Sequence, residues 1–186
     1  MIYFTPIKLK IESKIRHFAI SDIESRNISM PSIGQYAVDH ELPSDLLSEI
    51  NEELNGLGFP EVKYSKSYVR TNNNIQGIHI DGAGEPLHAA INIPLKGCND
   101  SKHIYYTGSY NKTNVVRHNL KYYELTWNST PVATTTLCLT SPHLLRVDEP
   151  HSAVAGSTEE RWIFTMRFVG NPTFEDLYAK LTKEKI

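Results

Sequence analysis

The sequence predicts a mainly β protein, a sandwich or a closed barrel, with helices on either side of the β block. Short runs rich in β-branched and aromatic residues follow one another through the middle of the chain, and Gly, Asn, Pro and Asp separate them. Many short strands with turn residues between them are typical of sandwiches and barrels. The runs are residues 63–71, 75–81, 87–95, 102–110, 132–140 and 161–169.

The first flanking helix is expected over about residues 44–57. Leu46, Ile50 and Leu54 recur there at helical spacing. Ser44 is a suitable N-cap and Gly56 a suitable end.

A second helix is expected over about residues 172–184. It should start at Asn171–Pro172, because proline favours the first turn. Its apolar face consists of Phe174, Leu177, Tyr178 and Leu181.

The rest of the chain is expected to add an N-terminal strand and no second domain. Residues 2–11 alternate and are interpreted as a strand. No stretch has the composition of a linker, so residues 1–186 are expected to form a single domain whose β core covers about residues 60–170.

Composition excludes several classes of protein. A net charge of −2 provides no basic surface for nucleic acid. No apolar run approaches the roughly 20 residues of a membrane span, and the N-terminus lacks the apolar centre of a signal peptide. Cys98 and Cys138 are too few for a disulfide framework and are expected to be reduced thiols. The expected location is the cytoplasm, with no nucleic acid or membrane as partner.

Alternation along two of the strands separates an apolar face from a polar one. This pattern fits a sheet with one solvated side, or a barrel whose inner face lines a polar pocket. In residues 87–95 the apolar face holds Leu87, Ala89, Ile91 and Ile93, and the other holds His88, Ala90 and Asn92. In residues 161–168 the apolar face holds Trp162, Phe164, Met166 and Phe168, and the other holds Arg161, Ile163, Thr165 and Arg167.

The segment before the last strand is expected to form a hairpin with it. Residues 151–155 would be one arm and residues 161–168 the other, with the turn centred near Thr158. His151 would then lie opposite Thr165. This register brings His151, Arg161 and Thr165 to one face, which favours the polar pocket, although a one-residue slip would reverse one arm.

The stretch around residue 80 suggests a metal site. His79 and Asp81 stand at i and i+2, so they project to the same side of a strand. His151 is the natural third ligand. Two imidazoles and one carboxylate on one face of a metal leave other positions open for a cosubstrate and dioxygen.

The spacing of these residues resembles that of a known superfamily. His79-x-Asp81 is followed about seventy residues later by His151, and Arg161 stands ten residues beyond it. This H-x-D…H…R pattern resembles the 2-oxoglutarate/Fe(II)-dependent dioxygenases over roughly residues 60–170. The resemblance implies a double-stranded β-helix (jelly-roll, cupin-like) fold, with Fe(II) on His79, Asp81 and His151. It also implies that Arg161 binds the distal carboxylate of 2-oxoglutarate, a task suited to a planar guanidinium, with Thr165 as a hydroxyl partner.

Within the superfamily the two segments are most similar to aspartyl/asparaginyl and prolyl hydroxylase-type enzymes. In the aspartyl/asparaginyl group a basic residue, usually arginine, lies about nine positions after the first ligand histidine; here that position is His88. His88 and Asn92 are therefore expected to line the cosubstrate pocket. The implied reaction hydroxylates a peptide side chain or a small molecule and releases succinate and CO₂.

Two other functions are compatible with the pattern. One is a catalytically silent jelly-roll module that binds a metal or a partner, since fold alone does not determine function. The other is a metal-dependent cupin-type enzyme that does not use 2-oxoglutarate. Arg161 argues against the latter, because such an enzyme has no distal carboxylate to bind.

Overall fold

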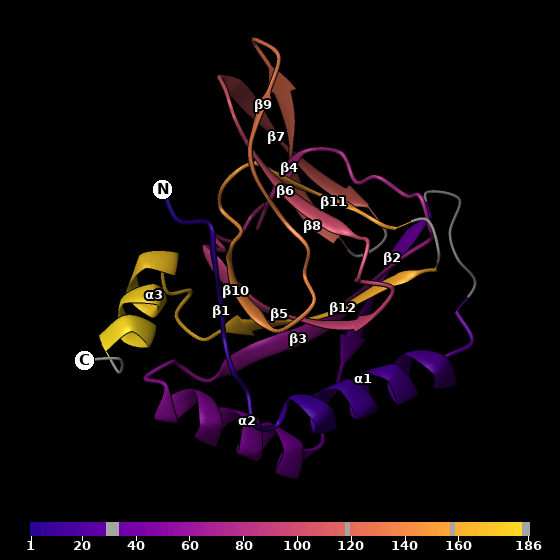
Figure 1. The fold of residues 1–186 in the computed structure, drawn as a ribbon, viewed down its shortest axis with the longest axis vertical. Helices are drawn as coiled ribbons and strands as arrows, with labels where there is room; N and C mark the ends of the chain where they lie inside the picture. Colours follow the sequence, from indigo (N-terminus) through magenta and orange to yellow (C-terminus); the bar gives the residue numbers. More distant parts are fainter. Residues whose placement is uncertain (29–33, 118–119, 157–158, 184–186) are drawn as a thin grey trace.

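The protein consists of two antiparallel β-sheets that face each other, with helices on the outside of one sheet (Figure 1). The computed structural model describes residues 1–28, 34–117, 120–156 and 159–183. In these ranges each sheet has six strands. The first sheet, in spatial order, contains β1 (Phe4–Pro6), β10 (His143–Arg146), β5 (Ala89–Lys96), β12 (Arg161–Phe168), β3 (Val62–Arg70) and β2 (Gln35–His40). The second contains β7 (Tyr110–Arg117), β8 (Leu120–Trp127), β4 (His79–Asp81), β11 (His151–Val154), β6 (Lys102–Thr107) and β9 (Val132–Leu137).

The order of the strands confirms the expected double-stranded β-helix. Strands β3, β4, β5 and β6 alternate between the first and the second sheet, and so do β10, β11 and β12. The chain thus crosses repeatedly from one sheet to the other, and polar side chains from both sheets can meet in the space between them.

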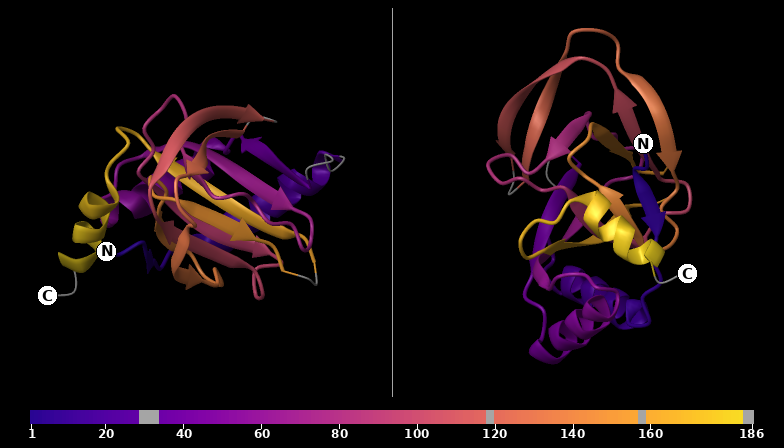
Figure 2. Two further views of the ribbon diagram at one scale, coloured as in Figure 1. Left: turned by 90° about the horizontal axis from the view of Figure 1, so that it is seen from above. Right: turned by 90° about the vertical axis from the view of Figure 1, so that its left-hand side faces the viewer.

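Two helices cover the outer face of the first sheet (Figures 1 and 2). One of them, α1 (Glu12–Ser25), was not predicted, although Ile15, Ala19 and Ile23 follow one another at four-residue spacing and are buried. The predicted strand over residues 2–11 is correct only for β1. After Pro6 the chain leaves the sheet. The alternating apolar side chains of Ile7, Leu9 and Ile11 pack in the layer between the first sheet and the helices.

The predicted helix near residue 50 is confirmed as α2 (Ser44–Gly56). Ser44 is its first helical residue and makes no capping hydrogen bond, because Pro43 occupies the N-cap position. Gly58, rather than Gly56, adopts the left-handed conformation, with φ of 70°.

The C-terminal helix α3 (Phe174–Lys183) starts later than predicted. Asn171 has φ of 46°, outside the helical region. The hydroxyl oxygen of Thr173 accepts a hydrogen bond from the Asp176 backbone N–H at 3.1 Å, which caps the helix at that point. Residue 184, the expected end, lies outside the described residues. Within the described ranges no helix has the length and apolar character needed to cross a membrane.

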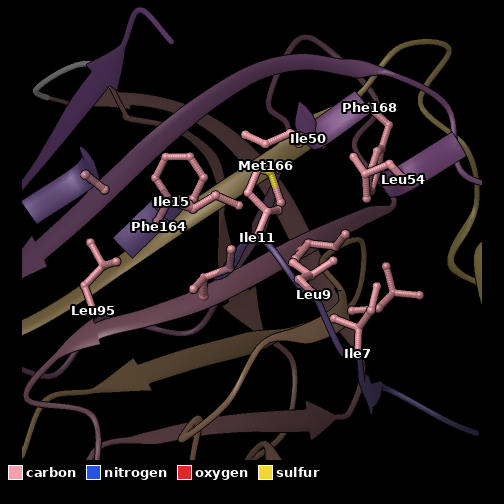
Figure 3. Packing of buried hydrophobic residues seen from close by; sticks show 14 of the residues in the cluster. Ile7, Leu9, Ile11, Ile15, Ile50, Leu54, Leu95, Phe164, Met166 and Phe168 are labelled. Carbon is pink, nitrogen blue, oxygen red and sulfur yellow. The ribbon is translucent and has the colours of Figure 1, made fainter. Parts of the chain in front are cut away.

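The apolar faces of β5 and β12 form the main core together with the helices, as Figure 3 shows. Phe164 and Met166 are fully buried against α1 and α2, and Ile91 and Ile93 join the same layer. The predicted faces of β12 are therefore confirmed along its whole length. Those of β5 are confirmed from Ala89 onward.

The predicted hairpin between residues 151–155 and 161–168 is wrong. β11 pairs with β4 and β6 in the second sheet, whereas β12 pairs with β3 and β5 in the first. The expected turn centre, Thr158, lies outside the described residues. The two strands face each other across the interior, so the polar side chains of both still point into the same space.

Candidate active site

A cavity of about 330 Å³ lies between the two sheets. It receives alternate side chains from β12 and from the neighbouring strand β3, because every second residue of a strand points to the same side. On β12 these are Arg161, Ile163, Thr165 and Arg167; opposite them on β3 lie Arg70, Tyr68, Lys66 and Tyr64. The second sheet contributes His79, Asp81, His103, Tyr122 and His151. The prediction of a polar pocket lined by basic groups is therefore confirmed.

The structure brings together the three residues proposed from the sequence as metal ligands. His79 and His151 are directly paired across β4 and β11. Asp81 lies two residues further along β4 and on the same side. One donor atom from each of the three residues falls within 4.8 Å of the others. His79 Nε2 lies 3.3 Å, and His151 Nε2 3.9 Å, from Oδ1 of Asp81.

Backbone carbonyls fix the orientation of both imidazole rings. Nδ1 of His79 lies 3.0 Å from the oxygen of Gly77, and Nδ1 of His151 lies 2.9 Å from that of Glu149. A carbonyl oxygen only accepts, so each Nδ1 carries the hydrogen and donates it. Nε2 is then the ring nitrogen that faces Asp81, the orientation found in metal-ligating histidines.

Arg167 holds the carboxylate of Asp81 from the other side. Its Nη2 lies 2.5 Å from Oδ2 of Asp81, and its Nη1 donates to the backbone oxygen of Ala89 at 3.3 Å. Burial by itself would raise the pKa of Asp81, but the charge of Arg167 outweighs it and holds this pKa well below its usual range. Asp81 is therefore ionised, with one oxygen bound to Arg167 and the other turned toward His79 and His151.

This donor set fits a divalent cation. Burial, followed by the nearby His79, lowers the pKa of His151 to about 4, so its imidazole is neutral at pH 7. Its Nε2 lone pair then faces an anionic oxygen of Asp81 with no hydrogen between them. A cation bound by both atoms removes this conflict. Two imidazoles and one carboxylate suit Fe(II) and similar first-row metals.

Gln76 makes a contact that the sequence did not reveal. Its side-chain nitrogen lies 2.9 Å from Nε2 of His79, so the amide donates to the atom that would bind a metal. Its side-chain oxygen accepts a hydrogen bond from Nη2 of Arg70. Gln76 therefore connects the candidate metal site to the arginine side of the cavity. Neither Gln76 nor Arg70 belongs to a motif, and only the fold brings them here.

Arg161 lies inside the cavity, as expected. Its side chain is 3% exposed, and its Nε donates to the hydroxyl of Ser101 at 3.2 Å. Burial lowers the pKa of Arg161. No carboxylate of the described residues forms an ion pair with its guanidinium. The cavity thus contains a cation that is available to an anionic ligand.

Of the other residues expected in the pocket, two line the cavity and one does not. Thr165 and Asn92 both line the cavity, where the Thr165 hydroxyl donates to Oδ1 of Asn92 at 2.6 Å. His88 is not among the residues that line it; its Nδ1 instead lies 2.8 Å from Oδ2 of Asp148. Leu87 lines the cavity in its place. Alternation holds only within a paired strand, and β5 begins at Ala89, so the faces assigned to residues 87 and 88 were wrong.

His103 is a further cavity residue that the sequence did not single out. Its ring stacks on that of His151, with centroids 4.8 Å apart and an interplanar angle of 19°. Burial and the nearby His151 lower the pKa of His103 well below its ordinary value, so the ring is neutral. It packs behind His151 and restricts the position of that ring.

No protein-family model matches the sequence, and no curated protein is significantly similar to it. Solved structures do share its fold. HygX from Streptomyces hygroscopicus, with nickel and 2-oxoglutarate bound, is 13% identical with a TM-score of 0.52, over 90% of this chain and 82% of HygX. An oxidoreductase of the 2OG-Fe(II) oxygenase family from Burkholderia pseudomallei is 9% identical with a TM-score of 0.51, over 88% of this chain and 82% of that protein. The chain therefore has the fold of the 2OG-Fe(II) oxygenases.

Proposed function

We propose that this protein is an Fe(II)- and 2-oxoglutarate-dependent dioxygenase that hydroxylates an unactivated C–H bond. One observation carries the proposal: His79, Asp81 and His151 lie close together in a cavity that Arg161 also lines. The first three residues supply donors for a divalent metal, and the fourth supplies a cation for a carboxylate. The fold that the chain shares with the 2OG-Fe(II) oxygenases supports the same function.

In this proposal His79, Asp81 and His151 hold Fe(II), which when bound supplies the chemistry that activates dioxygen. The overall reaction consumes 2-oxoglutarate, dioxygen and a C–H bond, and yields succinate, CO₂ and a hydroxyl group. One oxygen atom enters succinate and the other enters the product.

The side chains of the protein bind and orient the reactants. Arg161 binds the distal carboxylate of 2-oxoglutarate, with its planar guanidinium offering paired N–H donors. Thr165 and Asn92 offer further polar contacts on the same face. Arg167 keeps Asp81 ionised and turned toward His79 and His151. Arg161, Thr165 and Arg167 are buried, and their limited contact with water strengthens these electrostatic interactions.

The substrate in this proposal is a peptide side chain or a small molecule. A cavity of about 330 Å³ has room for 2-oxoglutarate and the reacting part of a substrate. A net charge of −2 supports neither nucleic acid nor an anionic membrane as a partner. Cys98 and Cys138 are free thiols, which suits the reducing cytoplasm proposed as its location. We also propose that residues 1–186 act as a single domain, because both sheets line one cavity.

The main alternative is a catalytically silent jelly-roll module that binds a metal or a partner. It shares the fold and the metal donors, but it gives no reason for a buried guanidinium without a protein carboxylate. An unpaired buried charge is costly, so Arg161 favours an anionic ligand.

Anaerobic titration with Fe(II) and then 2-oxoglutarate tests the proposal. The parent protein should develop the visible charge-transfer band of the iron chelate, and aerobic incubation should produce succinate. Arg161→Ala should weaken 2-oxoglutarate binding by about 2–5 kcal/mol, the scale for truncating one side of a buried charge pair. Iron affinity should change little in that variant. A parent protein that binds iron without any affinity for 2-oxoglutarate would favour the silent module.

A further inference from the structure

A second arginine, Arg70, lies beside Arg161. The two residues are directly opposite each other on the adjacent strands β3 and β12. Each is 3% exposed, and both line the cavity. Side chains at such positions start about 5 Å apart, and like charges placed opposite each other are destabilising. This arrangement therefore needs a compensating interaction.

The protein partners of Arg70 do not neutralise its charge. Its guanidinium donates to the side-chain oxygens of Gln35 and Gln76, and more weakly to that of Asn74 at 3.5 Å. All three are uncharged amides. Its Nε is buried and has no hydrogen-bond partner among the described residues. Within those residues, neither Arg70 nor Arg161 forms an ion pair with a carboxylate.

Arg70 does not lose its charge at pH 7, so the repulsion between Arg70 and Arg161 remains. Burial, followed by the charge of Arg161, lowers the pKa of Arg70 to about 9, so the side chain is still charged at pH 7. Two cations thus share one buried part of the cavity. A carboxylate can satisfy both, because its two oxygens offer about four acceptor sites.

We propose that Arg70 is a second guanidinium for the carboxylate that Arg161 binds, and that the pair selects 2-oxo acids with a distal carboxylate. This inference rests on the proposed function. Arg161 alone would bind an anion; Arg70 doubles the positive charge at the same place and adds its Nε–H, a donor that no described residue binds. A ligand with a methyl group there would leave both guanidinium groups buried and unpaired, which is strongly unfavourable.

The test compares two ligands of equal chain length. 2-Oxoglutarate carries a distal carboxylate, and 2-oxopentanoate carries a methyl group in its place. Isothermal titration of the nickel-loaded protein measures both dissociation constants without turnover. Arg70→Gln should weaken 2-oxoglutarate by about 10- to 100-fold, the range for a hydrogen bond to a charged group. It should change 2-oxopentanoate by less than about 3-fold, and nickel affinity should stay the same.

Lys66→Gln is the matched control. Lys66 lies on the cavity side of the same strand, and the substitution removes the same charge, but its ammonium pairs with Asp39 at 2.8 Å. It should change the affinity for 2-oxoglutarate by less than about 3-fold.

The outcomes separate this inference from the proposed function. A parent protein that fails to bind 2-oxoglutarate contradicts the proposed function. If the parent binds it and Arg161→Gln loses it while Arg70→Gln does not, the role of Arg70 is wrong and the function stands. Equal weakening of both ligands in Arg70→Gln also overturns the inference, because it indicates a merely structural role.

A second variant covers a failure to fold. Should the circular dichroism of Arg70→Gln show an unfolded protein, Arg70→Lys carries the test, because it keeps the charge and loses the planar donors. It should weaken 2-oxoglutarate at least about 3-fold more than 2-oxopentanoate. An equal effect on the two ligands contradicts the inference.

Discussion

Arg167 and Asp81 form a close ion pair at the side of the candidate metal site, with Nη2 and Oδ2 2.5 Å apart. The side chains are 3% and 19% exposed. Arg167→Met should lower the free energy of unfolding by about 3–5 kcal/mol, because it leaves the largely buried carboxylate of Asp81 without its partner. Urea denaturation of the metal-free protein measures this change.

Lys14→Met is the control for that experiment. Lys14 pairs with Glu49 at 2.5 Å, but both side chains are exposed, and exposed pairs contribute about 0–1 kcal/mol. If the two variants lose the same stability, the ion pair of Arg167 does not have the structural importance assigned to it.

The three candidate ligands should each be needed for metal binding. His79→Ala, Asp81→Ala and His151→Ala should each weaken Ni(II) binding more than about 100-fold, since even the loss of a residue that supports a ligand costs about 10- to 100-fold. His143→Ala should leave the affinity unchanged, because His143 lies in the other sheet and donates to the backbone of Ser141. Parent-like affinity in all three alanine variants would refute the ligand assignment.

Gln76 should compete with the metal for His79. Its amide must leave Nε2 of His79 before a metal can bind there. Gln76→Leu removes this hydrogen bond, whose net value is about 1 kcal/mol, and should therefore tighten Ni(II) binding by about 5-fold. Gln35→Leu is the matched control, because Gln35 also binds Arg70 but does not contact His79. Weaker metal binding in Gln76→Leu would show that Gln76 supports the site instead.

The stability of the metal-free protein should fall as the pH is lowered from about 7 to 5. Burial lowers the pKa values of His40, His103 and His151 below the ordinary value of 6.5. In this range the unfolded chain binds more protons than the folded one, so the free energy of unfolding rises with pH. The stability that depends on these histidines being neutral is fully present above pH 6.5. It is lost progressively below that pH, by up to about 1.4 kcal/mol per pH unit for each histidine.

Unfolding in the presence of a chelator at several pH values measures this slope. His103→Phe should reduce it, because a ring remains in the stack while the titratable group is gone. His17→Gln should leave it unchanged, because His17 is exposed. A slope that is the same in all three proteins would contradict the assignment.

The sequence by itself determined which side chains share a face. Period-two alternation assigned Phe164 and Met166 to the core and Arg161 and Thr165 to the cavity, and the structure confirms this. Helical spacing located α2 and α3 within a few residues. These features are local, because the geometry of a strand or helix fixes the direction of each side chain without reference to its partners.

Only the tertiary structure decided which strands pair. The sequence favoured β11 and β12 as a hairpin, yet they belong to opposite sheets. Alternation predicts the face of a strand, but not its neighbour, since pairing depends on contacts far along the chain. The face of His88 was wrong for a related reason: the sequence does not show where pairing in β5 begins.

The same limit applies to the surroundings of the candidate site. His79, Asp81 and His151 carry a recognisable spacing, whereas Arg70, Gln76 and Arg167 belong to no motif. Their roles arise because β3 and β12 lie side by side and face β4 across the cavity. The sequence determined the donor atoms of the site, and the packing of the two sheets determined which charges surround them.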